Sequence, residues 1–401
     1  MTIDVTLVLE GTYPYVTGGV STWVDGLVRG LPDLGFAVVH LRDEEAPRRA
    51  ARALPANVCL VLDVDVDPER PGGTAGLHDV PDGAVVHALS SGTAAVPGAA
   101  LARARGVPLV LTEHGLAWRE ALNGTGELES GRPPAGARRP AARAEARLAW
   151  ARDLAAMART GYAEATAITT VCSANARRQR RLGAPAARSA VTHNGVAARW
   201  LQGAPAAGPG AGEGPLFVLV GRVVPIKDTM GFLEAARLVL DAEPRARFAV
   251  VGPLDQDPDY AGGCLTRSAD LGLEAAVRFT GEADPCPWVA AATAVVLSSV
   301  SEAQPLALLE AMASGVPVVA PRVGGCPELV HGVEGDAGLL TVPGDPMACA
   351  RAMLRLAADD GLRARMGAAG RARAGRRHGP HVVPSAYRRV YERALADRGP
   401  A

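Results

Sequence analysis

Short apolar runs rich in Val and Leu recur along the chain, and the intervals between them leave room for a helix. Strands of a parallel sheet read as such continuous apolar runs, because helices cover both faces of the sheet. The runs predict strands in the first half of the chain at residues 5–9, 38–41, 58–62, 85–87, 109–111, 168–171 and 191–193. In the second half they predict strands at residues 216–220, 248–251, 277–279, 294–297 and 316–320. We therefore expect an α/β protein with doubly wound parallel sheets.

Residues 203–214 separate the two sets of strands and read as a linker, because they are nearly all Gly, Ala and Pro without periodicity. A chain of 401 residues is long enough for two domains of ordinary size. We expect one domain at residues 1–202 and another at residues 215–378, with a cleft between them. Residues 379–401 carry apolar side chains at helical spacing, which predicts a C-terminal helix that packs back on the first domain.

The charge balance narrows the classes of partner. The chain has 42 basic and 42 acidic residues, and only 4% of its residues are aromatic. Such a neutral chain is unlike a nucleic-acid-binding protein, so we expect no nucleic acid partner. Lys227 is the one lysine among the 42 basic residues, and the other 41 are arginines. We interpret the arginine-rich stretch at residues 132–159 as a solvated helix face, rather than as a contact for a membrane surface or an anionic acceptor.

Hydropathy and cysteine spacing indicate the cellular compartment of the protein. The chain has no apolar stretch of the roughly 18 to 20 residues that a membrane-spanning helix needs, and we expect no signal peptide at its start. Its six cysteines are scattered without a Cys-x-x-Cys pair, so we expect neither a zinc site nor a disulfide framework. These features predict a soluble, cytoplasmic protein with reduced thiols.

Two glutamates lie at the start of a helix predicted after a strand of the second half. Glu302 lies in the loop and Glu310 on the second turn, with Pro305 at the first helical position, where its missing N–H costs nothing. The free N–H groups of Leu306 and Ala307 and the positive end of the helix dipole favour a phosphate there. Carboxylates that lie beside a bound phosphate can accept hydrogen bonds from hydroxyl groups of the same ligand. The alternative is two solvated charges, but Glu310 lies in an apolar run, where an unpaired buried carboxylate is costly.

Two basic residues follow the first strand of the second half. Arg222 and Lys227 lie between this strand and a helix that begins near Asp228, a good N-cap residue. They therefore emerge at the carboxyl edge of the second sheet, on the same side as the helix that begins at Pro305. A guanidinium binds phosphate oxygens through two parallel hydrogen bonds and an ammonium acts as a compact point charge, so the pair suits a diphosphate. The alternative is a pair of ordinary surface charges.

Two features of the first half each leave two interpretations open. Gly18 and Gly19 form a glycine turn between the first strand and a helix, which is either a close approach to a ligand or a simple tight turn. His114 lies just after the strand at residues 109–111. A neutral imidazole there either donates a hydrogen bond to a substrate or has a structural role.

Together these segments resemble the retaining glycosyltransferases of family 4, which have the two-domain GT-B fold. Glu302 and Glu310 match the E-x7-E pattern of that family, and Gly221-Arg222 with Lys227 matches its G-R-x4-K pattern. The segments EGTYPYVTGGVSTWV, LTEHG and VGPLDQDPDY are most similar to the PelF-like subgroup. The resemblance extends over residues 7–340.

The resemblance implies that a sugar is transferred, with retention of configuration, from a nucleoside diphosphate sugar, with a UDP-sugar favoured, to an unidentified acceptor. The product would be a polysaccharide or a glycosylated metabolite. The first domain would lie on the acceptor side and the second would bind the nucleotide sugar. No metal and no further cofactor are expected, because cations and helix N–H groups can stabilise the leaving diphosphate.

The resemblance also implies roles for individual residues. Arg222 and Lys227 would bind the diphosphate, Glu310 the ribose hydroxyls, and Glu302 the hydroxyls of the donor sugar. The implied catalytic residues are His114, Lys227 and Glu302. The implied donor-binding residues are Gly18, Gly19, Arg222, Lys227, Glu302, Pro305, Leu306, Ala307 and Glu310. Two alternatives stay open: a nucleotide-sugar epimerase or hydrolase on the same fold, and a nucleotide-sugar-binding protein without catalysis.

Overall fold

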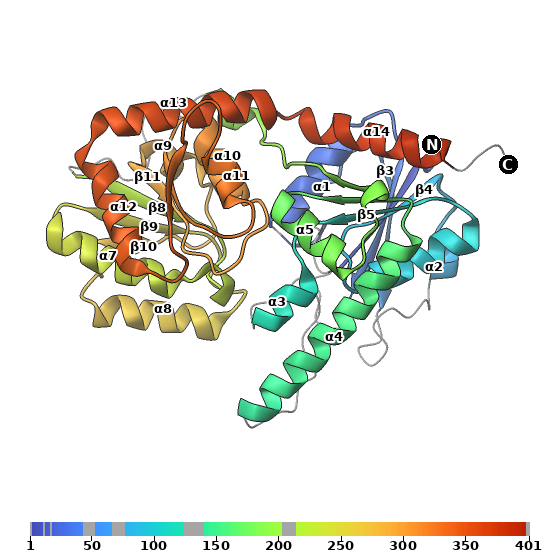
Figure 1. The fold of residues 1–401 in the computed structure, drawn as a ribbon, viewed down its shortest axis with the longest axis horizontal. Helices are drawn as coiled ribbons and strands as arrows, with labels where there is room; N and C mark the ends of the chain where they lie inside the picture. Colours follow the sequence, from blue (N-terminus) through green and yellow to red (C-terminus); the bar gives the residue numbers. More distant parts are fainter. Residues whose placement is uncertain are drawn as a thin grey trace. The chain divides into compact units, whose positions relative to one another are not determined.

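The computed structural model describes residues 2–10, 13–16, 18–42, 53–65, 77–123, 140–202 and 214–397 (Figure 1). The chain divides into two compact units, one formed by Met1–Asn194 with Pro380–Ala401 and the other by Gly195–Gly379. Each unit has a parallel sheet covered by helices, which confirms the predicted α/β class. Apart from Gly214, the predicted linker at residues 203–214 lies outside the described residues.

The described part of the first unit contains a seven-stranded parallel sheet in the order β3-β2-β1-β4-β5-β6-β7. Its strands are β1 (Val5–Glu10), β2 (Phe36–Arg42), β3 (Val58–Asp65), β4 (Val85–Ala88), β5 (Leu109–Glu113), β6 (Ala167–Thr170) and β7 (Ser189–Val191). Its α-helices are α1 (Gly19–Arg29), α2 (Ala95–Arg105), α3 (Ala117–Asn123), α4 (Pro140–Glu164), α5 (Ser173–Leu182) and α14 (Val382–Ala396). Helices α1 and α14 pack on one face of the sheet and α2 and α4 on the other, so both faces are buried.

The C-terminal helix α14 is part of the first unit. Tyr387 and Tyr391 are buried in the apolar cluster that also contains Leu7 of β1 and Leu27 of α1. Leu395, which continues the apolar spacing in the sequence, is 41% exposed, whereas the neighbouring Ala394 is buried in the cluster.

The described part of the second unit contains a six-stranded parallel sheet in the order β10-β9-β8-β11-β12-β13. Its strands are β8 (Leu216–Val220), β9 (Arg247–Val251), β10 (Val277–Phe279), β11 (Ala294–Val296), β12 (Val318–Pro321) and β13 (Gly338–Thr341). Its α-helices are α6 (Ala198–Leu201), α7 (Thr229–Ala242), α8 (Pro258–Asp270), α9 (Cys286–Ala291), α10 (Leu306–Ala313), α11 (Cys326–Val330), α12 (Pro346–Ala358) and α13 (Asp360–Arg377). Strand β13 is absent from the strands that the sequence predicts.

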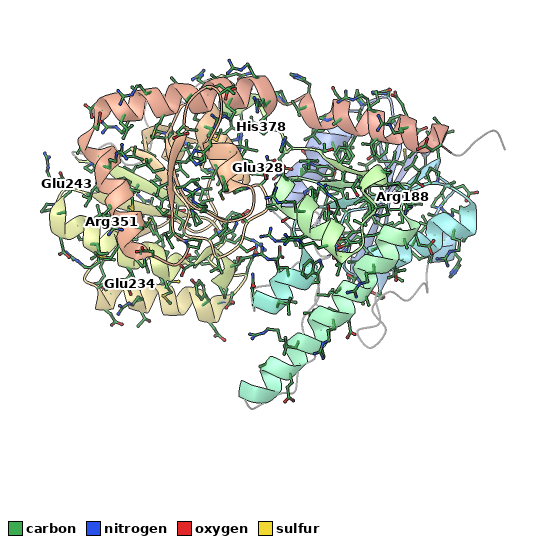
Figure 2. All side chains as sticks on the ribbon, viewed as in Figure 1. Arg188, Glu234, Glu243, Glu328, Arg351 and His378 are labelled. Atoms are coloured by element: carbon green, nitrogen blue, oxygen red, sulfur yellow. The ribbon has the colours of Figure 1, made fainter. Side chains whose placement is uncertain are left out.

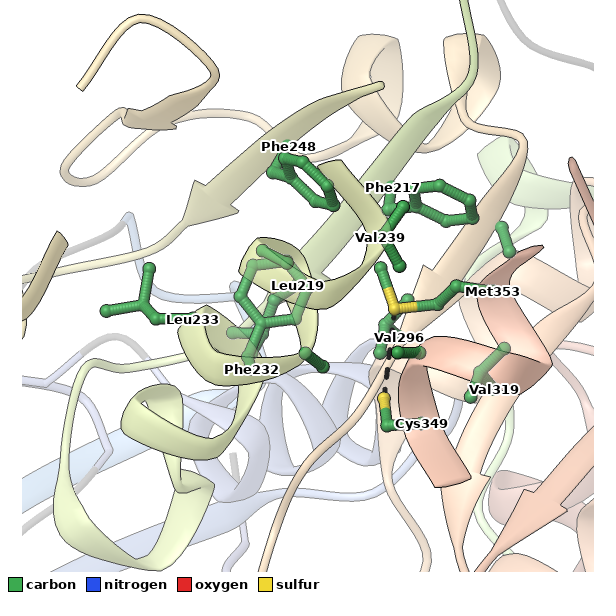
Figure 3. Packing of buried hydrophobic residues seen from close by; sticks show 14 of the residues in the cluster. Phe217, Leu219, Phe232, Leu233, Val239, Phe248, Val296, Val319, Cys349 and Met353 are labelled. Atoms are coloured by element: carbon green, nitrogen blue, oxygen red, sulfur yellow. Dashed lines mark hydrogen bonds between the residues drawn. The ribbon is translucent and has the colours of Figure 1, made fainter. Parts of the chain in front are cut away.

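An aromatic cluster anchors one face of the second sheet (Figure 3). Phe217 of β8 stacks on Phe248 of β9 with ring centroids 5.9 Å apart, and Phe232 of α7 meets Phe248 edge-on at 6.1 Å. Met353 of α12 packs in the same cluster. These side chains fix α7 and α12 on the sheet, so the loop before α7 has a rigid base.

The boundary between the units differs from the sequence prediction. Residues 195–202, expected in the first domain, cluster with the second unit. Trp200 of α6 is only 2% exposed and packs with Leu308 of α10. The Val196 N–H donates to the carbonyl oxygen of His378 at 2.7 Å. His378, labelled in Figure 2, directly follows α13. This packing, which the sequence pattern does not reveal, ties the segment to the second unit.

The strand order shows where each unit can bind a ligand. The chain changes direction across the sheet between β1 and β4 in the first unit and between β8 and β11 in the second. Ligands of doubly wound sheets bind outside the carboxyl ends of the strands at this point. The predicted residues lie in the segments that follow β1, β8 and β11, and His114 directly follows β5.

Candidate functional site

The loop after β8 carries the two predicted cations of the second unit. Arg222 is half-buried, and its Nη1 donates to Oε1 of Gln256 at 3.2 Å. Lys227 ends a short 3-10 helix, Pro225–Lys227, just before α7. Asp228 is the N-cap of α7, as the sequence predicts, and its carboxylate accepts from the Gly231 N–H at 3.1 Å. The cap fixes the end of the loop and therefore the origin of the lysine side chain.

Gly221 opens this loop in a conformation that requires glycine. Its φ is +155°, a value that L residues with side chains rarely adopt. The aliphatic stem of Lys227 lies 3.7 to 3.9 Å from where a Cβ of Gly221 would be. The glycine thus turns the chain sharply at the end of β8 and leaves the lysine stem in contact with the turn.

Lys227 forms an ion pair with Glu302. Its Nζ donates to Oε1 of Glu302 at 2.7 Å, and the Ser299 Oγ donates to the same oxygen at 2.7 Å. The side chains of Lys227 and Glu302 are 20% and 9% exposed, so the pair is largely shielded from water. The Ser298 Oγ also donates to the carbonyl oxygen of Lys227 at 2.8 Å. The structure therefore brings together two residues that lie 75 positions apart in the sequence.

Gly324, which sequence reasoning missed, fixes the backbone of Glu302. A Cβ on Gly324 would lie 1.5 Å from the carbonyl oxygen of Glu302, and its φ of +48° also favours glycine. The Gly325 N–H donates to the carbonyl oxygen of Ala303 at 2.6 Å. The glycine pair just after a strand is the signal that could have identified this support.

Helix α10 begins beside this ion pair, and one detail differs from the prediction. Pro305 is the N-cap residue with extended backbone, not the first helical residue, and Leu306 takes that place. No side chain caps the helix, so the N–H groups of Leu306 and Ala307 have no partner within the helix. The ring of Pro305 suits either place, because neither requires an N–H donor from it.

Glu310 lies on the second turn of α10 and is half-buried. Its pKa is raised to about 7, chiefly by burial, and the charge of Asp284 contributes in the same direction. The charge of Arg199 and a hydrogen bond with Trp200 act in the opposite direction. Arg199 in turn pairs with Asp284 at 3.7 Å. Sequence reasoning missed Trp200 and Arg199 because their segment was assigned to the other domain.

In the first unit, the predicted glycine turn lies at the start of α1. Gly18 is the N-cap of this helix and Gly19 its first residue, and no side chain caps the helix. The backbone of Gly18 is extended, which any residue can adopt, and a Cβ there would have no neighbour within 4 Å. The glycine is therefore not required by packing in this structure, and the space beside the helix start is open.

His114 follows β5, and its ring packs against an aromatic side chain. Its ring meets Trp23 of α1 edge-on, with centroids 4.5 Å apart and an interplanar angle of 72°. Burial lowers its pKa to about 4, so the imidazole is neutral at pH 7. Its Nε2 is buried and has no hydrogen-bond partner among the described residues. A buried polar atom without a partner is unusual and favours a ligand contact.

Glu113, next to His114, is a buried carboxyl group that sequence reasoning did not single out. It accepts hydrogen bonds from Ser91, from the Tyr162 hydroxyl at 2.6 Å and from Gln179. Burial raises its pKa, and the three donors partly offset this effect. Glu113 thereby ties the end of β5 to α4, to α5 and to the loop after β4, which holds the backbone of His114 in place.

The comparisons with known proteins concern the family and the fold. Residues 214–359 match the sequence family described as Glycosyl transferases group 1. The second unit carries a glycosyl transferases group 1 domain. Residues 3–76 and 73–187, in the first unit, match a family described only as Domain of unknown function (DUF3492).

Curated relatives of the group 1 domain are similar over part of their length. The D-inositol 3-phosphate glycosyltransferase of Streptomyces griseus is 38% identical over 191 residues, which are 46% of this chain and 39% of the relative. The enzyme of the same name from Corynebacterium glutamicum is 37% identical over 159 residues, which are 38% of this chain and 37% of the relative. The matches thus span about two fifths of these relatives.

Solved structures similar to this protein cover both units. Sucrose-phosphate synthase from Thermosynechococcus elongatus has a TM-score of 0.74 at 18% identity over 98% of this chain and 100% of its own. Anabaena HepE in complex with UDP-glucose has a TM-score of 0.73 at 20% identity, again over 98% and 100% of the two chains. The group 1 domain and the first unit together therefore have the GT-B fold. Among the described residues, no helix is both long and apolar enough to cross a membrane.

Proposed function

We propose that the protein is a retaining glycosyltransferase that moves a sugar from a nucleoside diphosphate sugar to a hydroxyl group of an acceptor. The observation that carries this proposal is the Lys227–Glu302 pair beside the uncapped start of α10, in a group 1 domain. A cation and free helix N–H groups suit a diphosphate, and a carboxylate beside them suits the hydroxyls of the attached sugar.

In this proposal Arg222 and Lys227 bind the diphosphate. Cleavage of the donor develops negative charge on the leaving diphosphate, and fixed cations and N–H groups lower the energy of that state. The N–H groups of Leu306 and Ala307 donate hydrogen bonds to the same diphosphate. The ion pair with Glu302 also explains how a carboxylate can lie beside a phosphate, because Lys227 offsets its repulsion.

The remaining roles follow the family 4 resemblance. Glu302 binds hydroxyls of the donor sugar, Glu310 binds the ribose hydroxyls, and His114 contacts the donor sugar through its neutral ring. Gly18 and Gly19 lie beside the phosphates and the acceptor. No metal or further cofactor takes part in this proposal.

The donor is proposed to be a UDP-sugar. HepE, which is similar in fold, binds UDP and UDP-glucose, and the PelF-like segments favour the same class of donor. The acceptor is a precursor of a polysaccharide or of a glycosylated metabolite. A cytoplasmic location stays a prediction of the sequence.

The test is a thermal-shift screen followed by product analysis. A saturating UDP-sugar is expected to raise the unfolding temperature by about 5 °C or more, because a ligand at 100 times its Kd adds about 2.7 kcal/mol. Labelled donor with an acceptor panel is expected to give a glycoside with unchanged anomeric configuration. Free epimerised sugar or hydrolysis without any glycoside would contradict the proposal, as would binding without release of nucleotide over every acceptor.

The pKa of Glu310 predicts how donor affinity depends on pH. A ribose hydroxyl donates to an ionised carboxylate, and the pKa of Glu310 in the free protein is about 7. Binding of the ionised form is therefore expected to make the Kd for UDP-glucose about tenfold lower at about pH 8 than at about pH 6. Calorimetry measures this directly, and UDP-glucose is chosen because its diphosphate keeps its charge over this range.

Glu310→Gln is the matched control for this prediction. The amide keeps the size of the side chain but does not ionise, so its Kd for UDP-glucose is expected to be higher than that of the wild type and independent of pH. A wild-type Kd that stays constant over the same range would show that Glu310 does not bind the nucleotide as a carboxylate.

A further inference from the structure

Trp23 contacts the ring of His114 from one side. It projects from the second turn of α1, the helix that begins at Gly19, and is 6% exposed. The edge-to-face contact with His114, at 4.5 Å and 72°, is the closest ring contact that Trp23 makes among the described residues. Such aromatic pairs add to the energy of burial and prefer a defined geometry.

Tyr387 of the C-terminal helix supports Trp23. Its ring meets Trp23 edge-on at 4.9 Å and 82°, and it stacks on His87 of β4 at 5.4 Å and 22°. Its hydroxyl forms hydrogen bonds with Thr112 of β5 at 2.9 Å and with Thr169 of β6 at 2.8 Å. The position of Tyr387 is thus fixed by three strands.

The same network holds His87, the titratable ring next to this assembly. Its Nδ1 and the Tyr391 hydroxyl are 2.8 Å apart, and its Nε2 and the Thr112 Oγ1 are 2.7 Å apart. Burial lowers the pKa of His87 to about 3, with a smaller contribution from His114. Among the described residues, the titratable groups near His114 include His87, neutral at pH 7, the hydrogen-bonded Glu113, and Glu120, whose carboxylate lies beside Gly115.

We propose that Trp23, held in place by Tyr387, is a positioning residue that fixes the ring of His114 for the transfer reaction. This inference rests on the role of His114 in the proposed function. The indole excludes water from one face of the imidazole, keeps the ring neutral and restricts its rotation. The Nε2 of His114, which has no hydrogen-bond partner within the described part of the chain, then keeps one orientation toward its substrate.

The alternative is that Trp23 only fills space in the core. A space-filling residue is replaceable by another apolar side chain at a cost in stability alone. A positioning residue also changes the chemistry of its neighbour. The two roles therefore differ in the titration of His114 and in kcat, and they do not differ in the unfolding temperature.

The experiment compares Trp23→Leu with Trp23→Phe. We expect Trp23→Leu to lower kcat about 30-fold, within the range for a catalytic group displaced by about 1 Å, and to change the donor KM less than about twofold. We expect Trp23→Phe, which keeps an aromatic edge, to restore most of kcat. In NMR titrations, with His114→Gln identifying the resonance, the His114 pKa should rise by more than about one unit in Trp23→Leu, because water regains access to the ring.

Three further variants protect the test against misfolding and loss of stability. Tyr387→Leu removes the support of Trp23 and is expected to lower kcat like Trp23→Leu, whereas Tyr387→Phe keeps the ring and stays near the wild type. Phe36→Leu, in the same apolar cluster but at the amino end of β2, should lower the unfolding temperature without changing kcat.

Wild-type kcat and an unchanged His114 titration in Trp23→Leu and Tyr387→Leu would overturn the inference. Failure of the proposed function has a different signature, since the wild-type protein would then transfer no sugar from any donor. In that case the NMR titration still decides whether Trp23 controls His114. An unchanged pKa would overturn the inference there as well.

Discussion

Replacing Lys227 with alanine is expected to lower kcat/KM for sugar transfer about 10³-fold while the protein stays folded, by analogy with the loss of one donor to a developing anion. Lys227 is only 20% exposed, and its ammonium is 2.7 Å from the Glu302 carboxylate. Its removal takes a cation from the diphosphate and leaves Glu302 to repel the same group. Steady-state kinetics with the donor found in the thermal screen measures the effect.

Lys227→Arg is the sharper variant, because it keeps the charge. The planar guanidinium is wider than an ammonium and cannot occupy the same position between Glu302 and the stem contact at Gly221. We expect kcat/KM to fall about 10²-fold, with the shift in unfolding temperature on donor binding reduced as well.

Arg351→Ala is the matched control for these variants. Arg351 is exposed on α12 of the same unit, and its replacement changes the net charge as much as Lys227→Ala does. We expect wild-type kinetics in this control. Wild-type activity in Lys227→Ala would refute the proposed diphosphate site, whereas full activity in Lys227→Arg alone would show that only the charge matters.

The composition gives this prediction further weight. All basic residues except Lys227 are arginines, so the chain uses arginine wherever a generic positive charge suffices. The remaining lysine is the residue that forms the ion pair with Glu302. A compact ammonium fits between a carboxylate and a phosphate, whereas a planar fork needs more room.

The fold was predictable because parallel strands need continuous apolar runs. Each predicted strand has a counterpart, for example residues 248–251 in β9 and residues 216–220 in β8. Strand β13 was missed because its sequence, Gly-Leu-Leu-Thr, begins with glycine and contains neither valine nor isoleucine, two of the residues that favour strands. It forms because β12 offers a free edge with which it pairs from Val318↔Gly338 onward.

The site was predictable only in part. Strand ends identify which side chains reach the carboxyl edge, and Arg222, Lys227, Glu302 and Glu310 were found in this way. Their partners depend on packing between distant segments. Trp200 lies 110 positions before Glu310, and local sequence contains no signal for such a contact.

The first unit shows the same limit. The motif LTEHG identifies His114, but the ring that contacts it comes from α1, and the residue that supports that ring comes from the C-terminal helix. The distance between Thr112 and Tyr387 in the sequence is 275 positions. Only the folded sheet, which brings β5 beside α14, reveals that these residues act on one another.

Arg373 gives the largest expected effect on stability. It lies in α13, is 1% exposed, and its guanidinium donates to the carbonyl oxygens of Leu329, Val330 and Gly335. Its Nε also donates to the Glu334 carboxylate at 3.0 Å. These side-chain contacts join α13 to α11 and to the segment before β13.

Arg373→Ala is expected to lower the free energy of unfolding of the second unit by about 3 kcal/mol, because the buried carbonyl oxygens of Leu329 and Val330 each lose a charged donor. For a unit of this size the unfolding temperature should fall by about 5 to 10 °C, measured by calorimetry. Arg371→Ala is the matched control, since Arg371 is exposed on the same helix and makes one hydrogen bond, to the Leu201 carbonyl oxygen at 2.9 Å. Its effect should stay below about 1 kcal/mol.

The dependence of this stability on pH follows from Glu334. A hydrogen bond from Arg376, then one from its own backbone and one from Arg373, lower the pKa of Glu334 from 4.5 to about 2. Since the folded pKa lies below the ordinary value, the ionised carboxylate stabilises the unit above about pH 4.5, and this contribution is lost as the pH falls toward 2. Glu334→Gln should therefore show a smaller loss of stability than the wild type over this interval. Equal losses, or a wild-type unfolding temperature in Arg373→Ala, would contradict the assigned role of the cluster.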